Sequence, residues 1–171
     1  MGVEGDGGWV HAAVECGMTS DSSSNSPHAR TGVFWDIQAG RRAQPAVAAL
    51  LGFELLEVDP DAGTIKIRFQ TRPEFANPVG NVRGGILAAM LDDALGPALV
   101  ATLEPEQFAP TIELKVNYIE SARVGPPLIA SARVVARKRT IAFVAGELRD
   151  EAGALIATAT ATARIQTMRS P

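Results

Sequence analysis

The sequence predicts an α+β fold, in which a mainly antiparallel sheet of six strands wraps around one long central helix. Residues 77–102 open with a turn-rich loop and continue as an apolar run, long enough for about 18 residues of helix, or about 27 Å. Two strand-like runs precede this helix and four follow it. Hairpin-length turns join the last three strands, which makes those neighbouring strands antiparallel.

Short turns and alternating apolar residues mark the strands, as in the turn at 59–63 between the first two. The strands are expected at 53–58, 64–69, 111–119, 128–138, 141–149 and 154–165. In the last run threonines alternate with alanines, which is typical of a strand with two different faces. Ahead of all of them, residues 34–51 predict a short helix or two, interrupted around Gly40 and Pro45.

Two adjacent carboxylates, Asp92 and Asp93, interrupt the apolar helix, and charged groups are seldom buried without a partner or a task. Helical spacing puts Asp92 on a face of small residues such as Gly85, where a ligand or a close-packed backbone has room. Asp93 shares a bulkier face with Met90 and Pro97. Because Pro97 removes a backbone hydrogen bond, it is expected to kink or end the helix.

Gly84 and Gly85 stand at the expected start of the helix, where unpaired backbone N–H groups and the helix dipole favour negative charge. The pattern therefore places donors for an oxyanion about two helical turns from a carboxylate. An alternative fits the same spacing. In that case the glycines form a turn into a core helix, and its acids face solvent or an interface.

Composition and charge exclude several classes of function. With 171 residues, 46% hydrophobic and 20% charged, the chain is expected to form one globular domain. The net charge of −3, without a long basic run, argues against nucleic-acid binding, and the interrupted apolar helix argues against a membrane span. The single cysteine, Cys16, excludes an intrachain disulfide and fits a reducing compartment, so a cytoplasmic location is expected.

Residues 1–32 are rich in glycine and serine and are predicted to be a disordered leader, with the folded domain at 33–171. The leader has the pattern of neither a secretory signal nor a myristoylation site. It contains both histidines, His11 and His28, and the only cysteine. Histidine-dependent triads and metal sites are therefore not expected in the domain, and its chemistry has to run on carboxylates, hydroxyls, amides and backbone dipoles, without a cofactor.

Three stretches carry a family resemblance: NPVGNVRGGILAAMLD at 77–92, TIELKVNY at 111–118 and RVVARKRTIAFVAGELRDEAGALIATATAT at 133–162. In this order they resemble the hotdog-fold acyl-CoA thioesterases of the phenylacetic-acid-degradation (PaaI-like) group, over roughly residues 45–166. The resemblance implies a homodimer with a continuous sheet, or a homotetramer. It also implies active sites at the subunit interface, which hydrolyse an acyl- or aryl-acyl-CoA thioester to the free acid and CoA.

The resemblance implies four catalytic residues. Asp92 matches the helix carboxylate that acts as nucleophile or general base, and Gly84 matches the glycine whose N–H polarises the thioester carbonyl. Asn77 matches a loop asparagine near the thioester or the attacking water, and Thr111 matches a hydroxyl residue that helps to hold this water. The alternatives are an Asp92 paired to Arg83 or to another subunit, and a Thr111 that is an ordinary strand residue.

Five further residues are candidates for substrate binding. The group commonly has histidine where this chain has Arg83, and a guanidinium there could reach a carboxylate or a phosphate. Gly85 leaves room for an acyl thioester beside the catalytic carboxylate. Arg137, Lys138 and Arg139 form a basic cluster at a hairpin, which suits the phosphates of CoA but also fits a solvated turn.

Two other functions are compatible with the same fold, because fold alone does not settle function. One is a non-catalytic protein that binds acyl-CoA or another acyl ligand, which would show affinity for thioesters without turnover. The other is the hydratase branch of the hotdog fold, which uses an Asp and His pair. The domain has no histidine, so the hydratase alternative is set aside.

Overall fold

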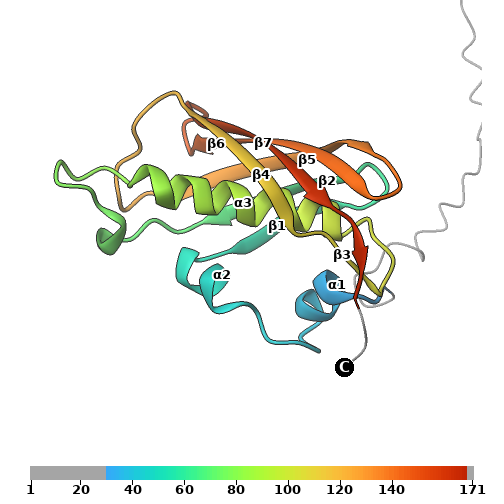
Figure 1. Cartoon of the computed structure of the whole chain (residues 1–171). Coiled ribbons are helices and arrows are strands. Elements are labelled where there is room, and N and C mark those ends of the chain that lie inside the picture. The colour runs from blue at the N-terminus through green and yellow to red at the C-terminus, as the bar shows by residue number, and fades with distance from the viewer. Residues whose placement is uncertain (1–29, 169–171) are drawn as a thin grey trace, which may run out of the picture.

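Six antiparallel strands form the sheet of this computed structural model, which describes residues 30–168 (Figure 1). The order across the sheet is β1-β2-β5-β6-β7-β4. The strands are β1 (Glu54–Asp59), β2 (Thr64–Phe69), β4 (Thr111–Tyr118), β5 (Leu128–Arg137), β6 (Ile141–Asp150) and β7 (Leu155–Arg164). The predicted α+β fold and the antiparallel six-stranded sheet are confirmed.

One long helix, α3 (Gly84–Val100), lies against one face of the sheet, and the sheet curves around it (Figure 1). Seven of its side chains are at most 3% exposed: Leu87, Met90, Leu91, Ala94, Leu95, Ala98 and Leu99. Burying one such leucine contributes about 1.5–3 kcal/mol, so this face of the helix supplies much of the core stability.

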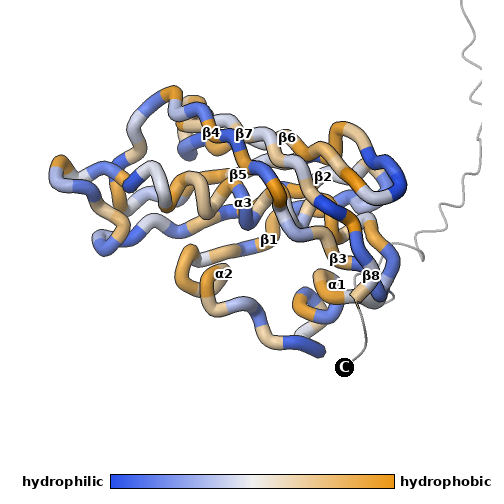
Figure 2. The backbone as a smooth tube through the Cα atoms, in the orientation of Figure 1, coloured by the Kyte–Doolittle hydropathy of each residue, from blue (hydrophilic) through white to orange (hydrophobic). Residues whose placement is uncertain are grey.

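Strand β7 shows how the sequence separates the two faces of the sheet. Its alanines at 157, 159, 161 and 163 are at most 5% exposed and face α3. The threonines between them point to the outer face, and the same alternation of apolar and polar positions is visible along other strands (Figure 2). The predicted two-faced strand is confirmed. Small inward side chains let the helix pack close to the sheet.

Pro97 was expected to kink or end α3, and the second of these alternatives is wrong, because three more helical residues follow the proline. Proline removes only one backbone hydrogen bond, the one that would reach the carbonyl of Asp93. The last turn is held by other contacts. Ala98 and Leu99 are buried, and Trp35 Nε1 donates to the carbonyl of Ala101 at 3.3 Å.

The remaining elements are short. The predicted helical segment forms two helices, α1 (Val33–Gln38) and α2 (Ala46–Leu51), which lie on the opposite side of α3 from β4 and β7 (Figure 1). A 3-10 turn, η1 (Pro73–Phe75), precedes α3. A small two-stranded sheet, β3 (Gln107–Phe108) with β8 (Gln166–Thr167), was not predicted, because two-residue strands carry no periodicity.

Most of the predicted disordered leader lies outside the described residues, as do His11, Cys16 and His28. Arg30, the first described residue, contacts the domain: its guanidinium lies 3.4 Å from Asp61 and 5.5 Å from the ring centre of Trp35. Among the helices of residues 30–168, none is long and apolar enough to cross a membrane.

Candidate active site

The N-terminus of α3 has no side-chain cap. Its N-cap residue is Arg83, which has no acceptor atom, and the Arg83 Nε instead donates to the carbonyl of Ala76 at 3.1 Å. The N–H groups of Gly84 and Gly85 have no acceptor within residues 30–168. Two backbone donors at the positive end of a 17-residue helix therefore remain available to an anion or a polarised carbonyl oxygen.

Asn77 organises the loop that leads to these donors. Its Oδ1 accepts from the N–H of Val79 at 3.1 Å and of Asn81 at 3.0 Å, which closes an Asx turn. Gly80, at φ 83°, provides the left-handed conformation that this turn needs. The side-chain nitrogen of Asn77, Nδ2, has no acceptor among the described residues, so it can donate to a substrate or a water.

Tyr118 completes this end of the site, although sequence reasoning did not single it out. Its hydroxyl donates to the carbonyl of Gly84 at 2.9 Å. A Cβ added to Gly84 would lie only 3.1 Å from the Tyr118 ring, so the tyrosine also keeps this position small. Its position could have been inferred from the sequence, because strand alternation puts Tyr118 on the same inward face of β4 as Leu114 and Val116, and its ring carries a hydroxyl.

Asp92 and Thr111 meet at the middle of α3. The Thr111 hydroxyl donates to Asp92 Oδ1 at 3.0 Å, and both residues are solvent-exposed in the single chain. A β-bulge at Ile112 makes this contact possible. Strict alternation would turn Thr111 to the outer face, whereas the bulge pairs it with Ala163, an inward position, and aims it at the helix.

Asp93 differs from its neighbour in environment. It is half-buried, and its Oδ2 is buried without a hydrogen-bond partner in the described chain. Burial, and after it the charge of Asp92, raises the pKa of Asp93 from 3.8 to about 6. Asp92 thus presents an accessible carboxylate that accepts a hydrogen bond from a hydroxyl, while the raised pKa of Asp93 lets this carboxyl bind a proton at a higher pH than an ordinary aspartate.

The predicted catalytic residues form two groups that one chain does not bring together. Gly84 lies at the start of α3, with Asn77 in the loop before it. Asp92 lies eight residues further along the helix, with Thr111 of β4 beside it. Eight helical residues span about 12 Å. An oxyanion donor has to lie about 3 Å from the reacting carbonyl oxygen, and a base that acts through one water has to lie within about 6 Å of the carbonyl carbon. Neither half of the site can therefore complete the chemistry with the other half of the same chain.

The basic cluster lies at the hairpin between β5 and β6, whose tip is hydrophilic (Figure 2). Arg137 Nη1 donates to the carbonyl of Thr102 at 2.9 Å, so this guanidinium stabilises the turn that follows α3. Lys138 and Arg139 are exposed and make no ion pair within residues 30–168. Two of the three cations are thus available to a ligand.

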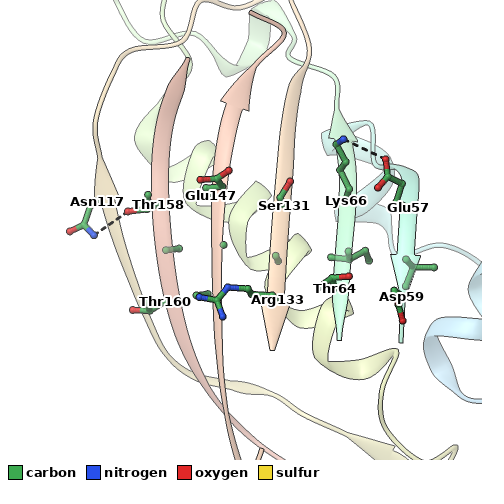
Figure 3. A pocket seen from close by; sticks show the side chains of 16 residues that line it. Glu57, Asp59, Thr64, Lys66, Asn117, Ser131, Arg133, Glu147, Thr158 and Thr160 are labelled. Carbon is green, nitrogen blue, oxygen red and sulfur yellow. Dashed lines mark hydrogen bonds and ion pairs between the residues drawn. The ribbon is translucent and has the colours of Figure 1, made fainter. Parts of the chain in front are cut away.

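A hollow of about 850 Å³ lies on the outer face of the sheet, on the opposite side from α3 (Figure 3). Polar side chains line it, including the pair Lys66–Glu57 at 3.4 Å and a hydrogen bond of 3.3 Å from Asn117 to Thr158. The sheet separates this hollow from Asp92, so it is not part of the candidate site.

Comparison with known proteins identifies the family of this chain. A family model described as the thioesterase superfamily matches residues 79–157. A phenylacetic acid degradation-related protein from Ralstonia eutropha is 39% identical, with a TM-score of 0.74, over 77% of this chain and 98% of its own. The chain belongs to the thioesterase superfamily. The expected PaaI-like hotdog fold and a thioester-hydrolysing enzyme are thereby confirmed.

Two further relatives of this thioesterase widen the comparison. Human acyl-coenzyme A thioesterase 13 is 29% identical over 98 residues, which is 56% of this chain and 68% of the human protein. A Streptococcus mutans protein, whose crystal structure contains acetyl CoA, is 22% identical. It has a TM-score of 0.62 over 69% of this chain and 91% of its own, which is a likeness of fold.

Proposed function

We propose that this thioesterase hydrolyses an acyl- or aryl-acyl-CoA thioester to the free acid and CoA, at sites formed between two copies of the chain. One observation carries the proposal. Strand β4 touches one half of the site at each of its ends: Thr111 donates to Asp92, and Tyr118 donates to the carbonyl of Gly84.

Pairing of two β4 strands would join these halves. The strand is at the edge of the sheet. Ile112 and Tyr118 within it, and Ile119 directly after it, leave 59%, 53% and 58% of their surface exposed. Uncovered edge strands with apolar side chains are usually paired or protected. In an antiparallel pair about a two-fold axis, the start of one β4 lies beside the end of the other. Asp92 of one copy then faces Gly84 of the second copy.

The proposed chemistry uses both halves on one thioester. Asp92 removes a proton from water, whose oxygen bonds to the carbonyl carbon, and Thr111 holds the carboxylate through Oδ1. The N–H of Gly84 stabilises the oxyanion, with Gly85 beside it and the amide of Asn77 nearby. The carbon–sulfur bond then breaks, and CoA leaves with the proton. Direct attack by Asp92, followed by hydrolysis of the anhydride, uses the same groups.

The basic hairpin is the proposed site for the CoA phosphates. Thr111 pairs with Ala163, and Ala163 pairs with Ala142, which places the β6 end of the hairpin about 10 Å from Thr111 across the sheet. Lys138 and Arg139 lie beyond this point, at a distance that suits a phosphate separated from the thioester by an extended arm. Arg83, exposed at the other half of the site, is a second candidate cation.

A panel of acyl-CoA thioesters with detection of the released thiol tests the activity. That the fold accommodates such a ligand is supported by the Streptococcus mutans neighbour with acetyl CoA. Thiol release from at least one member supports the proposal. Binding of these thioesters without release would instead assign the chain as a non-catalytic acyl-CoA-binding protein.

A subunit complementation experiment tests the two-copy site. Asp92→Asn removes the base, while Asn77→Asp keeps the acceptor of the Asx turn and removes the amide donor. Each variant alone should be nearly inactive. Co-expression with two different tags yields heterodimers in which one of the two sites is intact, so they should regain about half of the wild-type activity. Inactive heterodimers would contradict the shared site, even if the wild type is active.

A further inference from the structure

We propose that Tyr118 is a positioning residue of this thioesterase, which holds the first turn of α3 so that the Gly84 N–H stays directed at the thioester oxygen. The inference rests on the proposed function and adds to it a residue that contacts no reacting atom. Tyr118 is the last residue of β4, so it connects the proposed pairing strand directly to the oxyanion donor.

The contact is specific in both hydrogen bonding and shape. The Tyr118 hydroxyl donates at 2.9 Å to the carbonyl of Gly84, which belongs to the same residue as the catalytic N–H. The ring lies where a side chain at residue 84 would be, with its Cζ 3.1 Å from an added Cβ. At Gly85, one residue further, an added Cβ would meet nothing within 4 Å. A side chain at residue 84 would therefore have to displace the Tyr118 ring, so the fold favours glycine there because of Tyr118 and not because of the backbone, which is helical.

The first turn of α3 needs a stabilising contact from another element, because it lacks the capping side chain that usually stabilises a helix N-terminus. No side chain caps α3, and Arg83 is directed to the carbonyl of Ala76. An uncapped first turn frays readily, since its N–H groups have no partner. A capping side chain would stabilise the turn but would also occupy the donors. Tyr118 stabilises the same turn through a carbonyl and leaves the N–H groups of Gly84 and Gly85 free.

Tyr118→Phe removes the hydroxyl and keeps the ring, and the side chain is 53% exposed, so the variant should fold and dimerise like the wild type. Loss of a whole oxyanion donor costs about 10²–10³ in kcat, so loss of its positioning should cost about tenfold, with KM within about twofold. Thermal melting and sedimentation serve as controls. An unchanged kcat would overturn the inference.

Two CoA analogues separate positioning of the oxyanion donor from ordinary substrate binding. A trifluoromethyl ketone analogue, whose hydrate resembles the tetrahedral intermediate, should bind Tyr118→Phe about tenfold more weakly. A thioether analogue, which has no carbonyl, should bind both proteins equally. Equal weakening of both analogues would overturn the inference. If the wild type releases no thiol from any thioester, the proposed function fails, while the analogue binding still decides the role of Tyr118.

A double-mutant cycle tests the shape of the contact. Gly84→Ala keeps the N–H but pushes a Cβ against the ring, so it should lower kcat and melting temperature in the wild-type background. In a Tyr118→Leu background, where the ring is absent, the same substitution should have almost no further effect. An equal loss in both backgrounds would mean that the substrate, and not Tyr118, requires glycine at this position.

Discussion

At the scale of single residues, two adjacent aspartates show how environment separates identical side chains. Asp92 is exposed and held by the Thr111 hydroxyl, whereas Asp93 is half-buried with one oxygen lacking a partner in the described chain. The accessible carboxylate is suited to activate water. The carboxyl of Asp93 is less accessible, and its burial together with the charge of Asp92 raises its pKa.

Replacement of the two acids should therefore have unequal effects. Asp92→Asn keeps the shape and removes the base, so kcat on the best acyl-CoA should fall by about 10²–10⁴, with folding preserved. Asp93→Asn should reduce kcat far less. Thiol-release kinetics of both variants measure this difference. Equal losses, or an undiminished Asp92→Asn enzyme, would falsify the assignment.

The raised pKa of Asp93 also predicts a pH-dependent stability. Between its ordinary value of 3.8 and about 6, the native state binds more proton than the unfolded state, so this residue's contribution to stability falls as pH rises through that range. Asp93→Asn removes the effect. The variant should exceed the wild type in free energy of unfolding at pH 8, and this advantage should shrink as the pH is lowered toward 5. Urea titrations at the two pH values test it, and an advantage independent of pH would contradict it.

At the scale of elements, local sequence signals predicted the strands well. Turn residues and alternation placed all six long strands to within one residue, because both signals are local. Long-range effects were not predictable. Continuation of α3 past Pro97 depends on tertiary contacts, and the β-bulge that aims Thr111 at Asp92 has no signature in this strand. Of the candidate site, the residue types and the two helical turns between Gly84 and Asp92 were predictable, while Tyr118 and the contact of Thr111 with Asp92 required the fold.

Gly85 allows a test of what lies above the first turn of α3. It is helical and a Cβ there meets nothing in the chain, so Gly85→Ala should stabilise the helix by about 0.5–1 kcal/mol. If the thioester lies over this position, kcat/KM should fall at the same time. Gly96→Ala, equally unobstructed, provides the matched measure of the gain in stability. A loss of stability at Gly85 alone would show that another subunit occupies the space, and unchanged kcat/KM would show that the thioester lies elsewhere.

At the scale of the whole molecule, the boundary of the folded domain can be tested by truncation. Removal of residues 1–29 should leave melting temperature and activity nearly unchanged, because their composition offers little apolar surface to bury. Removal through residue 38 deletes Phe34 and Trp35, which are at most 5% exposed, and should cost several kcal/mol of stability at about 1.5–3 kcal/mol for each buried side chain. Calorimetry of both truncations measures the contrast. A marked destabilisation by the shorter truncation would show that the leader packs on the domain.

The bulge at Ile112 makes the Asp92–Thr111 contact of the candidate site depend on strand register as well as on residue identity. Each extra or missing residue in a strand reverses the faces of everything beyond it up to the next irregularity. Ile112 is the extra residue of this bulge, because Thr111 pairs with Ala163 and Glu113 pairs with Thr162. Deletion of Ile112 would therefore leave a regular strand in which Thr111 still faces Asp92, whereas a strand of the present length without the bulge would turn the threonine toward the outer face. A homologue with the same residues at the same spacing but no bulge would match this protein by motif and lack the contact. In this family, a one-residue gap at Ile112 in an alignment is compatible with the contact, while an ungapped match does not by itself establish it.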